Sequence, residues 1–375
     1  MRVAYPMRVD AFDKPGGDLL LVQQYIQAVR NAGVTPDQDF YGEVIVDLDA
    51  DLSGFDVIHL TNIDRPVETH QFFLAAQAAG KPVVISPIHH SHREMERYER
   101  EGRRGAIRFI SKILSFRGFQ YFRSIVHSIQ HRELIRPTFK TFLKGMRRSQ
   151  VAVLQGVDRV LVLADKERAD ILADFGVVTD ERFFRVRIGF EPAPSAAGVS
   201  RDNDVCVVGR IESRKNQIAI LDALEKLGLK GIFAGRENPN QQTFCTEFKQ
   251  KILRSKSEFT GGLTPEEVVD LMRRSKVHVS ASWFEASSLV DIEAYFAGCA
   301  VVSSIGGATR EILGESAQYV DPGESASIQR GITAALASRS LQGDNLSRID
   351  KSVTESWEQI GSQLAQIYRG LLHKD

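Results

Sequence analysis

Short apolar segments alternate with amphipathic segments along the first half of the chain. The apolar runs that have the length and composition of β-strands are Arg2–Tyr5, Glu43–Val46, Val57–Leu60, Pro82–Ser86 and Arg159–Leu163. The stretches between them carry apolar residues at helical spacing, for example at Leu19–Ala32 and Glu68–Ala79. Strands that alternate with helices predict a mostly parallel sheet with helices on both faces.

The second half repeats this scheme. Its predicted strands are Asp204–Val208, Lys230–Ala234, Val277–Ser280 and Ala300–Ser303, with helical patterns between them such as Gln217–Leu227 and Pro265–Arg273. Residues 191–198, between the halves, are small and rich in proline, which is typical of a linker. The pattern therefore predicts an α/β protein of two Rossmann-like, doubly wound domains, residues 1–190 and 199–354. Ligands of such domains bind beside the carboxyl ends of the strands, in a central cleft that the two domains face.

The composition indicates a compartment but no partner. A chain of 375 residues suits two domains, and its formal net charge of zero points to no charged partner. Cys206, Cys245 and Cys299 lie far apart, as in proteins of a reducing compartment. The N-terminus lacks a signal-peptide pattern, and no apolar run is long enough to span a membrane. We expect a cytoplasmic protein that can lie on the inner face of a membrane without crossing it.

Residues 277–298 combine a strand, a short loop and the start of a helix. Glu285 lies in the loop, and the helix is predicted to begin near Ser288. Unpaired N–H groups and the positive end of the helix dipole make such a start a seat for phosphate. Glu293, further along the helix, can accept hydrogen bonds from two adjacent hydroxyls, such as those of a ribose. Taken alone, these two glutamates also fit a solvated helix face.

Cations follow the first strand of the second half. Gly209 ends that strand, and Arg210 and Lys215 are spaced to converge on one diphosphate. Arginine offers two parallel hydrogen bonds to such an anion, and lysine offers a point charge. Either residue alone fits a basic loop without a ligand, but the ordered set favours a diphosphate site.

Taken in order, these motifs resemble the C-terminal domain of the retaining family-4 glycosyltransferases (glycosyl transferases group 1), which have the GT-B fold. The matching segments are Gly209–Lys215, Phe259–Gly261, Glu285–Ala294, Ala297–Val302 and Gly306–Glu311. Ser356–Tyr368 is also similar to the last helix of that family, which crosses back to the N-terminal domain. Residues 355–375 would thus complete the domain of residues 1–190. The likeness covers most of residues 200–375 and is weaker before them.

The resemblance implies contacts with the donor phosphates. Arg210 and Lys215 would neutralise the diphosphate, which leaves as the nucleotide. The backbone N–H groups of Ser288 and Leu289 would contact the same phosphates.

The resemblance also implies contacts with the donor hydroxyls. Glu285 would hold hydroxyls of the sugar, and Glu293 would hold the ribose. The chain departs from the family at residues 286–290, where Gly-Phe-Gly-Leu-Pro is usual, and at Thr309, where a proline is usual. These departures point to an uncommon sugar.

A glycine-rich turn opens the first predicted helix. Gly16 and Gly17 leave their backbone open to a phosphate, although a tight turn without a ligand fits equally well. In the resembled family this loop faces the donor diphosphate across the cleft, so both glycines are candidates for donor binding.

Histidines gather after the fourth predicted strand, at His89, His90 and His92. No convincing carboxylate or cysteine completes a ligand set, and GT-B enzymes generally need no metal, so we expect neither a metal nor a cofactor. In the resembled family a histidine at this strand end lies beside the anomeric carbon of the donor. His89 is the first candidate for this catalytic position and His90 the alternative, while a structural role stays open for either.

Residues 102–150 break the alternating pattern. They contain 12 Lys or Arg and one acid, Glu133, interleaved with phenylalanine and tyrosine. The segment is predicted to be mainly helical with a break near Pro137. A core helix with a solvated basic face, contact with an anionic membrane, and nucleic-acid binding all fit this composition. No nucleic-acid-binding module is recognised, so we expect no nucleic-acid partner. Membrane contact would bring the N-terminal domain, which is the acceptor-side domain, to a lipid-linked acceptor.

Together these features predict a glycosyltransferase that moves a sugar from a UDP- or GDP-linked donor to a hydroxyl of a lipid-linked or saccharide acceptor. The resemblance implies a metal-independent, hexosyltransferase-like reaction with retention, in bacterial-type polysaccharide or glycolipid assembly. One alternative is a nucleotide-sugar 2-epimerase, which needs no acceptor. Another is a non-catalytic protein that binds nucleotide sugar, and only the altered residues 286–290 support it.

Overall fold

The computed structural model describes residues 1–14, 16–32, 39–103, 114–176, 179–191, 199–342 and 354–373. Internal contacts divide the chain into two units. The N-terminal unit comprises residues 1–91, 115–191 and 354–375, and the C-terminal unit comprises residues 92–114 and 192–353. Of the predicted linker, residues 192–198 lie outside the described residues.

The N-terminal unit holds a six-stranded parallel sheet in the order β2-β1-β3-β4-β5-β6. Its strands are β1 (Arg2–Pro6), β2 (Tyr41–Ile45), β3 (Val57–Thr61), β4 (Val83–Ser86), β5 (Arg159–Val162) and β6 (Phe183–Arg185). The C-terminal unit holds a second six-stranded parallel sheet in the order β12-β11-β10-β7-β8-β9. Its strands are β7 (Asn203–Val208), β8 (Gly231–Ala234), β9 (Glu258–Gly261), β10 (Ser275–Val279), β11 (Ala300–Ser304) and β12 (Ala317–Val320).

Every predicted strand is present, whereas β6, β9 and β12 were not predicted. All three lie at an edge of a sheet. None of the three is buried along its whole length, unlike β3 and β4. Strands buried on both faces are continuous apolar runs, and half-exposed edge strands lack that signal.

Each sheet has a switch point, where the order of the strands reverses. In the N-terminal unit β1 lies between β2 and β3, and in the C-terminal unit β7 lies between β8 and β10. In open parallel sheets, ligands bind outside the carboxyl ends of the strands at this point. Ligand sites are therefore expected at the loops after β1 and β3 in the N-terminal unit and at the loops after β7 and β10 in the C-terminal unit.

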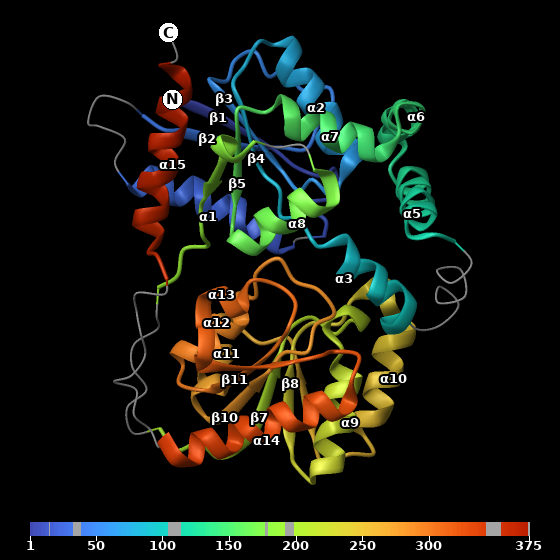
Figure 1. Cartoon of the computed structure of the whole chain (residues 1–375), viewed down its shortest axis with the longest axis vertical. Helices are drawn as coiled ribbons and strands as arrows, with labels where there is room; N and C mark the ends of the chain where they lie inside the picture. The colour runs from blue at the N-terminus through green and yellow to red at the C-terminus, as the bar shows by residue number, and fades with distance from the viewer. Residues whose placement is uncertain are drawn as a thin grey trace. The chain divides into compact units, whose positions relative to one another are not determined.

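The last helix of the chain belongs to the N-terminal unit, as predicted. Helix α15 (Trp357–Leu372) packs against α1 (Gly17–Asn31), and both are labelled in Figure 1. Its buried Tyr368 hydroxyl lies 3.0 Å from the hydroxyl of Tyr5 and 2.7 Å from Nδ1 of His59. These contacts reach β1 and β3, so the final helix is part of the N-terminal core.

The remaining helices of this unit include most of the basic segment. They are α2 (Pro66–Ala78), α5 (Phe116–Gln130), α6 (Ile135–Lys144), α7 (Met146–Gly156) and α8 (Asp165–Phe175). The expected break near Pro137 is present: α5 ends at Gln130, α6 begins at Ile135, and Pro137 lies in the first turn of α6. Proline is tolerated there because the first N–H groups of a helix have no partner within the helix. Among the described helices, none is long and apolar enough to cross a membrane.

Helices cover both faces of the C-terminal sheet. They are α9 (Gln217–Leu227), α10 (Gln242–Ile252), α11 (Pro265–Arg273), α12 (Leu289–Phe296), α13 (Thr309–Leu313) and α14 (Ser325–Gln342), joined by α3 (His92–Arg97) and a π-helix (Tyr98–Gly102). Val205 and Val207 of β7 enter one apolar cluster, and Cys206 enters the cluster on the other face. This alternation is what a strand buried on both faces requires.

Candidate functional site

The N-terminus of α12 carries a buried hydroxyl without a hydrogen-bond partner in the part of the chain that the structure describes. Ser288 is the N-cap residue, its side chain is buried, and its Oγ has no partner. Leu289 is the first residue of the helix, close to the predicted start. The first N–H groups of a helix lack partners within the helix, so an anion oxygen placed here could bind both the hydroxyl and the backbone.

Glu293 lies one turn further along α12. Its half-buried carboxylate makes no side-chain hydrogen bond or ion pair with any residue that the structure describes. Burial raises the pKa of Glu293, and the nearby charge of His278 opposes this shift. A partly desolvated carboxylate without a partner can accept hydrogen bonds from a ligand at little cost.

Glu285, in the loop between β10 and α12, is held by two cations. One carboxylate oxygen binds Nζ of Lys215, and the other lies 2.9 Å from Nη1 of Arg214. Burial favours the neutral form of Glu285, but the charges of Arg214 and Lys215 outweigh it and hold the pKa well below its usual range. Lys215 and Glu285 therefore form an ion pair with each other, whereas the sequence predicted that each would contact a ligand separately.

Arg214 is a residue of this site to which sequence reasoning gave no role. Its guanidinium also lies 2.9 Å from Oε1 of Glu212 and 5.4 Å from the centre of the Phe284 ring. The sequence could not separate Arg214 from Lys215 because adjacent residues of a short turn point in directions that only the fold defines.

Arg210 follows β7 in the same loop as Lys215, and its side chain is exposed. Close packing fixes the backbone at Gly209, where a Cβ on Gly235 would lie 2.0 Å from the Gly209 carbonyl oxygen. Gly209 also has a φ of 151°, which favours glycine. The loop after β7 thus leaves the sheet along a fixed path, with Arg210 directed outward.

Helix α3 and the π-helix that follows it contact the loops after β7, β10 and β12. The Tyr98 hydroxyl lies 2.5 Å from Oγ of Ser213, and the Tyr98 ring packs edge-on against Phe284 with ring centres 5.4 Å apart. Arg97 forms an ion pair of 2.8 Å with Asp321 and lies over the ring of Trp283. No pattern in the sequence predicted these contacts, because they join residues more than a hundred positions apart.

In the N-terminal unit, Arg8 organises the glycine-rich turn. Its Nε lies 2.8 Å from a carboxylate oxygen of Asp18, and its Nη1 lies 2.7 Å from a carboxylate oxygen of Asp10. Gly16 is the N-cap of α1, and a Cβ there would lie 2.7 Å from Oδ1 of Asp18. A Cβ on Gly17 would meet nothing within 4 Å. The backbone at Gly16 is thus packed against Asp18 and Arg8, while the backbone at Gly17 is open.

A pocket opens at the switch point of the N-terminal sheet. It is lined by Pro6, Met7, Arg8, Asp18, Leu60, Thr61, Asn62, Arg65, Glu68, Thr69 and Phe72. Charged groups of both signs therefore meet the apolar ends of β1 and β3 around a cavity of about 10 Å³, which has room for about one water molecule.

His89 is buried between two carboxylates. Its Nδ1 lies 2.7 Å from Asp64 and its Nε2 lies 2.9 Å from Asp174. Burial opposes a charge on the ring, but Asp64 and Asp174 together raise the pKa of His89 to about 10. These contacts fit the structural role that the sequence left open. The side chain of His90 is more exposed, and its Nδ1 lies 3.0 Å from Asp64.

Residues 194–351 match the model of the family "Glycosyl transferases group 1". The matched region covers the loops after β7 and β10 and helix α12, so it contains the site just described. The predicted resemblance to the group 1 glycosyltransferases is thus confirmed for the C-terminal domain. A search of curated proteins finds no significant match.

Several solved structures share the fold of the whole chain. HepE from Anabaena, in complex with UDP and glucose, has a TM-score of 0.68 at 15% identity, with 99% of this chain and 100% of that chain covered. Sucrose-phosphate synthase from Thermosynechococcus elongatus has a TM-score of 0.67 at 16% identity, with all of both chains covered. A glycosyltransferase from Rickettsia africae has a TM-score of 0.65 at 13% identity, with 100% of this chain and 99% of that chain covered. Together with the two parallel sheets, these likenesses confirm the GT-B fold.

Proposed function

We propose that this chain, whose residues 194–351 match the group 1 glycosyltransferases, transfers a sugar from a nucleoside diphosphate to a hydroxyl acceptor with retention. The observation that carries the proposal is the start of α12. There the buried Ser288 hydroxyl and the Glu293 carboxylate lack partners among the described residues, next to a loop in which Glu285 is held in place. Phosphates would bind the helix start, and Glu293 would accept hydrogen bonds from the ribose.

Catalysis in this proposal is stabilisation of the leaving diphosphate. The negative charge that develops on the diphosphate as its bond to the sugar breaks would be stabilised by Arg210, Lys215 and the N–H groups of Ser288 and Leu289. Lys215 would exchange its contact with Glu285 for a phosphate oxygen, while Arg214 keeps the carboxylate oriented toward the sugar hydroxyls. The acceptor would attack the face from which the diphosphate departs, so no protein nucleophile and no metal ion is required.

The donor that we propose to test first is UDP-linked. HepE was solved with UDP-glucose, and it shares the fold but only 15% of the sequence. A GDP-linked donor is the alternative, because base selection depends on contacts that the fold alone does not specify.

The acceptor would bind the N-terminal unit. The cavity at the switch point of its sheet is lined by Arg65 and Glu68, and by Arg8, which lies 2.8 Å from Asp18. Gly17, with an open backbone on the rim of the same turn, keeps its predicted role in donor binding as part of this proposal.

Helices α5 and α6 would hold the protein on an anionic membrane. On α6, Ile135, Phe139 and Leu143 recur at the helical repeat and are 52%, 64% and 74% exposed. On α5, Phe122, Ile125, Val126 and Ile129 form a second exposed apolar stripe. A helix that packs only against its own protein buries such a stripe, whereas a helix on a bilayer surface exposes it.

The charges beside these stripes favour a lipid surface over another apolar protein. The exposed cations of this region are Arg117, Arg123, Arg132, Arg136, Lys140, Lys144, Arg147 and Arg148. Each basic residue near an anionic bilayer contributes about 1 kcal/mol to binding. A protein held on the membrane in this way would use a lipid-linked acceptor at the cytoplasmic face, in polysaccharide or glycolipid assembly.

The deciding experiment measures nucleotide release from UDP- and GDP-sugars, with and without lipid-linked and saccharide acceptors. Release that requires an acceptor, with the anomeric configuration kept in the product by NMR, is the expected result. Conversion of the donor to its 2-epimer without an acceptor would replace the proposal by the epimerase alternative. Stabilisation by nucleotide without any turnover across the panel would identify a non-catalytic binding protein.

A further inference from the structure

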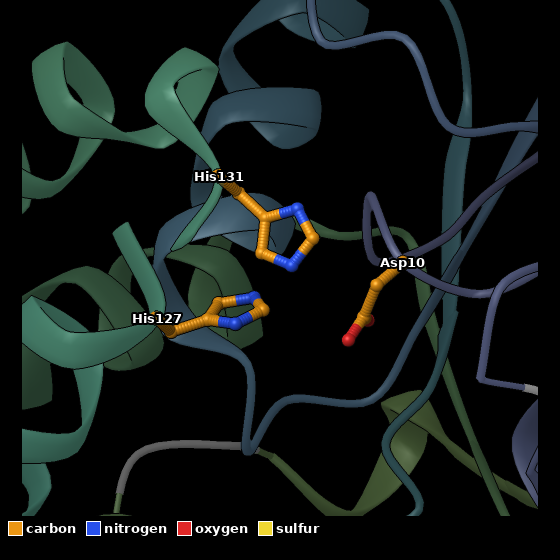
Figure 2. A group of neighbouring side chains, drawn as sticks. All are labelled: Asp10, His127 and His131. Atoms are coloured by element: carbon orange, nitrogen blue, oxygen red, sulfur yellow. The ribbon is translucent and has the colours of Figure 1, made fainter. Parts of the chain in front are cut away.

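Three potential metal ligands meet on the N-terminal unit, close to the glycine-rich turn. They are the carboxylate of Asp10 and the imidazoles of His127 and His131, and one ligand atom from each lies within 4.8 Å of the others. Figure 2 shows the two rings and the carboxylate around a common space. The ring centres of the two histidines are 4.7 Å apart, with planes inclined by 55°.

Local structure brings these side chains together. His127 lies in the last turn of α5 and His131 is its C-cap residue, so the spacing of four positions puts both rings on one side of the helix. Asp10 lies in the loop after β1, where Arg8 Nη1 holds one of its oxygens at 2.7 Å. Helix α5 and the loop after β1 therefore each supply part of the group.

The neighbouring groups are those that orient ligands around a metal. Oε1 of the buried Glu68 lies 3.2 Å from Nε2 of His127. A carboxylate that accepts a hydrogen bond from one ring nitrogen fixes the other nitrogen as a ligand, a common arrangement around zinc. The donor set of two imidazoles and one carboxylate suits zinc, with the fourth position left for water.

The charged groups around Asp10 are known. Arg8 is shared between Asp10 and Asp18, and the charge of Arg65 also acts on both carboxylates. Lys14 lies 3.5 Å from the second oxygen of Asp10, but its side chain is 44% exposed and can swing into solvent. A divalent ion would replace this long ion pair with direct coordination.

We propose that Asp10, His127 and His131 bind a divalent cation of the zinc class, and that this ion ties the end of α5 to the loop after β1. The ion would fix the helix that carries the exposed apolar stripe, next to the cavity that Arg8 and Glu68 line. Its test is metal binding itself, so the proposal stands or falls independently of the proposed activity.

The test is zinc binding by the full-length chain after treatment with a chelator. Calorimetric titration is expected to give one ion per chain, and Co²⁺ is expected to give the visible absorption of a nitrogen- and oxygen-ligated ion. His131→Ala should weaken binding at least tenfold, and the double variant His127→Ala/His131→Ala should abolish it. His373→Ala, which removes an exposed histidine elsewhere in the same unit, is the matched control and should bind like the wild type.

Stoichiometric binding that survives in the double variant would overturn the proposal, as would the absence of binding at micromolar zinc. If loss of His127 leaves Glu68 unpaired and the chain does not fold, His131→Gln decides instead, because the His131 side chain is partly exposed and bonds only weakly to Glu133. A second readout is hydrogen exchange of α5, which zinc should slow in the wild type and leave unchanged in His131→Gln.

Discussion

Nη1 of Arg214 lies 2.9 Å from Oε2 of Glu285, on the opposite side of the carboxylate from Lys215. Two cations on one buried carboxylate keep it ionised, which the lowered pKa of Glu285 reflects despite the opposing effect of burial. Because Arg214 also binds Glu212, it is fixed from two directions, whereas Lys215 has one partner in this group. Lys215 is therefore the cation that can turn to a ligand.

Arg214→Ala should lower kcat by about 5- to 150-fold, since the loss of a contact of about 1–3 kcal/mol at the sugar corresponds to that range. The Kd for the free nucleotide should change little, because Arg214 orients Glu285 and does not bind the phosphates. Steady-state kinetics and calorimetry with the nucleotide check both values. Arg254→Ala, an exposed arginine of the same domain, serves as control, and an equal loss of nucleotide affinity and kcat in Arg214→Ala would contradict the assignment.

Glu293→Ala should weaken nucleotide binding about tenfold or more, because hydrogen bonds to a charged group contribute about 1.5–3 kcal/mol. The raised pKa of Glu293 adds a test by pH. As the pH falls through this pKa, the carboxylate takes up a proton and loses an acceptor, so wild-type affinity should fall, and Glu293→Gln should lack this step. Calorimetry at a series of pH values from neutral down to the ordinary pKa of glutamate, about 4.3, checks it. Glu266→Ala, at an exposed position of α11, should bind like the wild type.

His89→Gln should destabilise the chain by about 3 kcal/mol near pH 6, because it leaves Asp64 and Asp174 without their shared cation. The pKa of His89 is raised from 6.5 to about 10 in the folded state, so its stabilising effect is complete below 6.5 and is lost as the pH rises toward 10. Urea unfolding at several pH values should therefore show a difference in the free energy of unfolding between wild type and variant, and this difference should become smaller from pH 6.5 to 10. His373→Gln should show no such gap.

Phe139→Glu/Leu143→Glu should abolish binding to vesicles that contain anionic phosphatidylserine or phosphatidylglycerol, since the two residues are among the most exposed apolar side chains of α6. Wild-type binding should weaken with added salt, because the cations of α5 and α6 contribute through screened attraction. Cosedimentation measures both effects. Leu253→Glu replaces an 84% exposed leucine in the other unit and should bind like the wild type. If the wild-type protein does not bind anionic vesicles at low salt, the proposed membrane contact is wrong.

Gly361→Ala should destabilise the N-terminal unit by about 1–3 kcal/mol. A Cβ on Gly361 would lie 2.1 Å from the carbonyl oxygen of Ala28, so α15 would have to move away from α1. Gly370→Ala is the matched control on the same helix: a Cβ there would meet nothing within 4 Å, and alanine should stabilise the helix by about 0.5–1 kcal/mol. In thermal unfolding, Gly361→Ala should lower the midpoint temperature and Gly370→Ala should raise it.

Of the candidate site, the sequence located the helix start at Ser288 and the glutamate that follows it, because helix caps and helical spacing are local properties. It also located Glu285 and Lys215 but not their ion pair, since that contact spans 70 positions. The partners of His89 were not predicted for the same reason: Asp64 and Asp174 lie on different elements of the N-terminal unit.

The sequence by itself determined the strands buried on both faces of each sheet, the helices between them and the order of the motifs along the chain. These features follow from burial and backbone geometry within a few residues. Only the tertiary structure decided which charged groups neutralise one another, that the edge strands join the sheets, and that His127 and His131 meet Asp10. Such pairings depend on distances between elements far apart in the chain, and no local pattern of hydrophobic and polar residues specifies those distances.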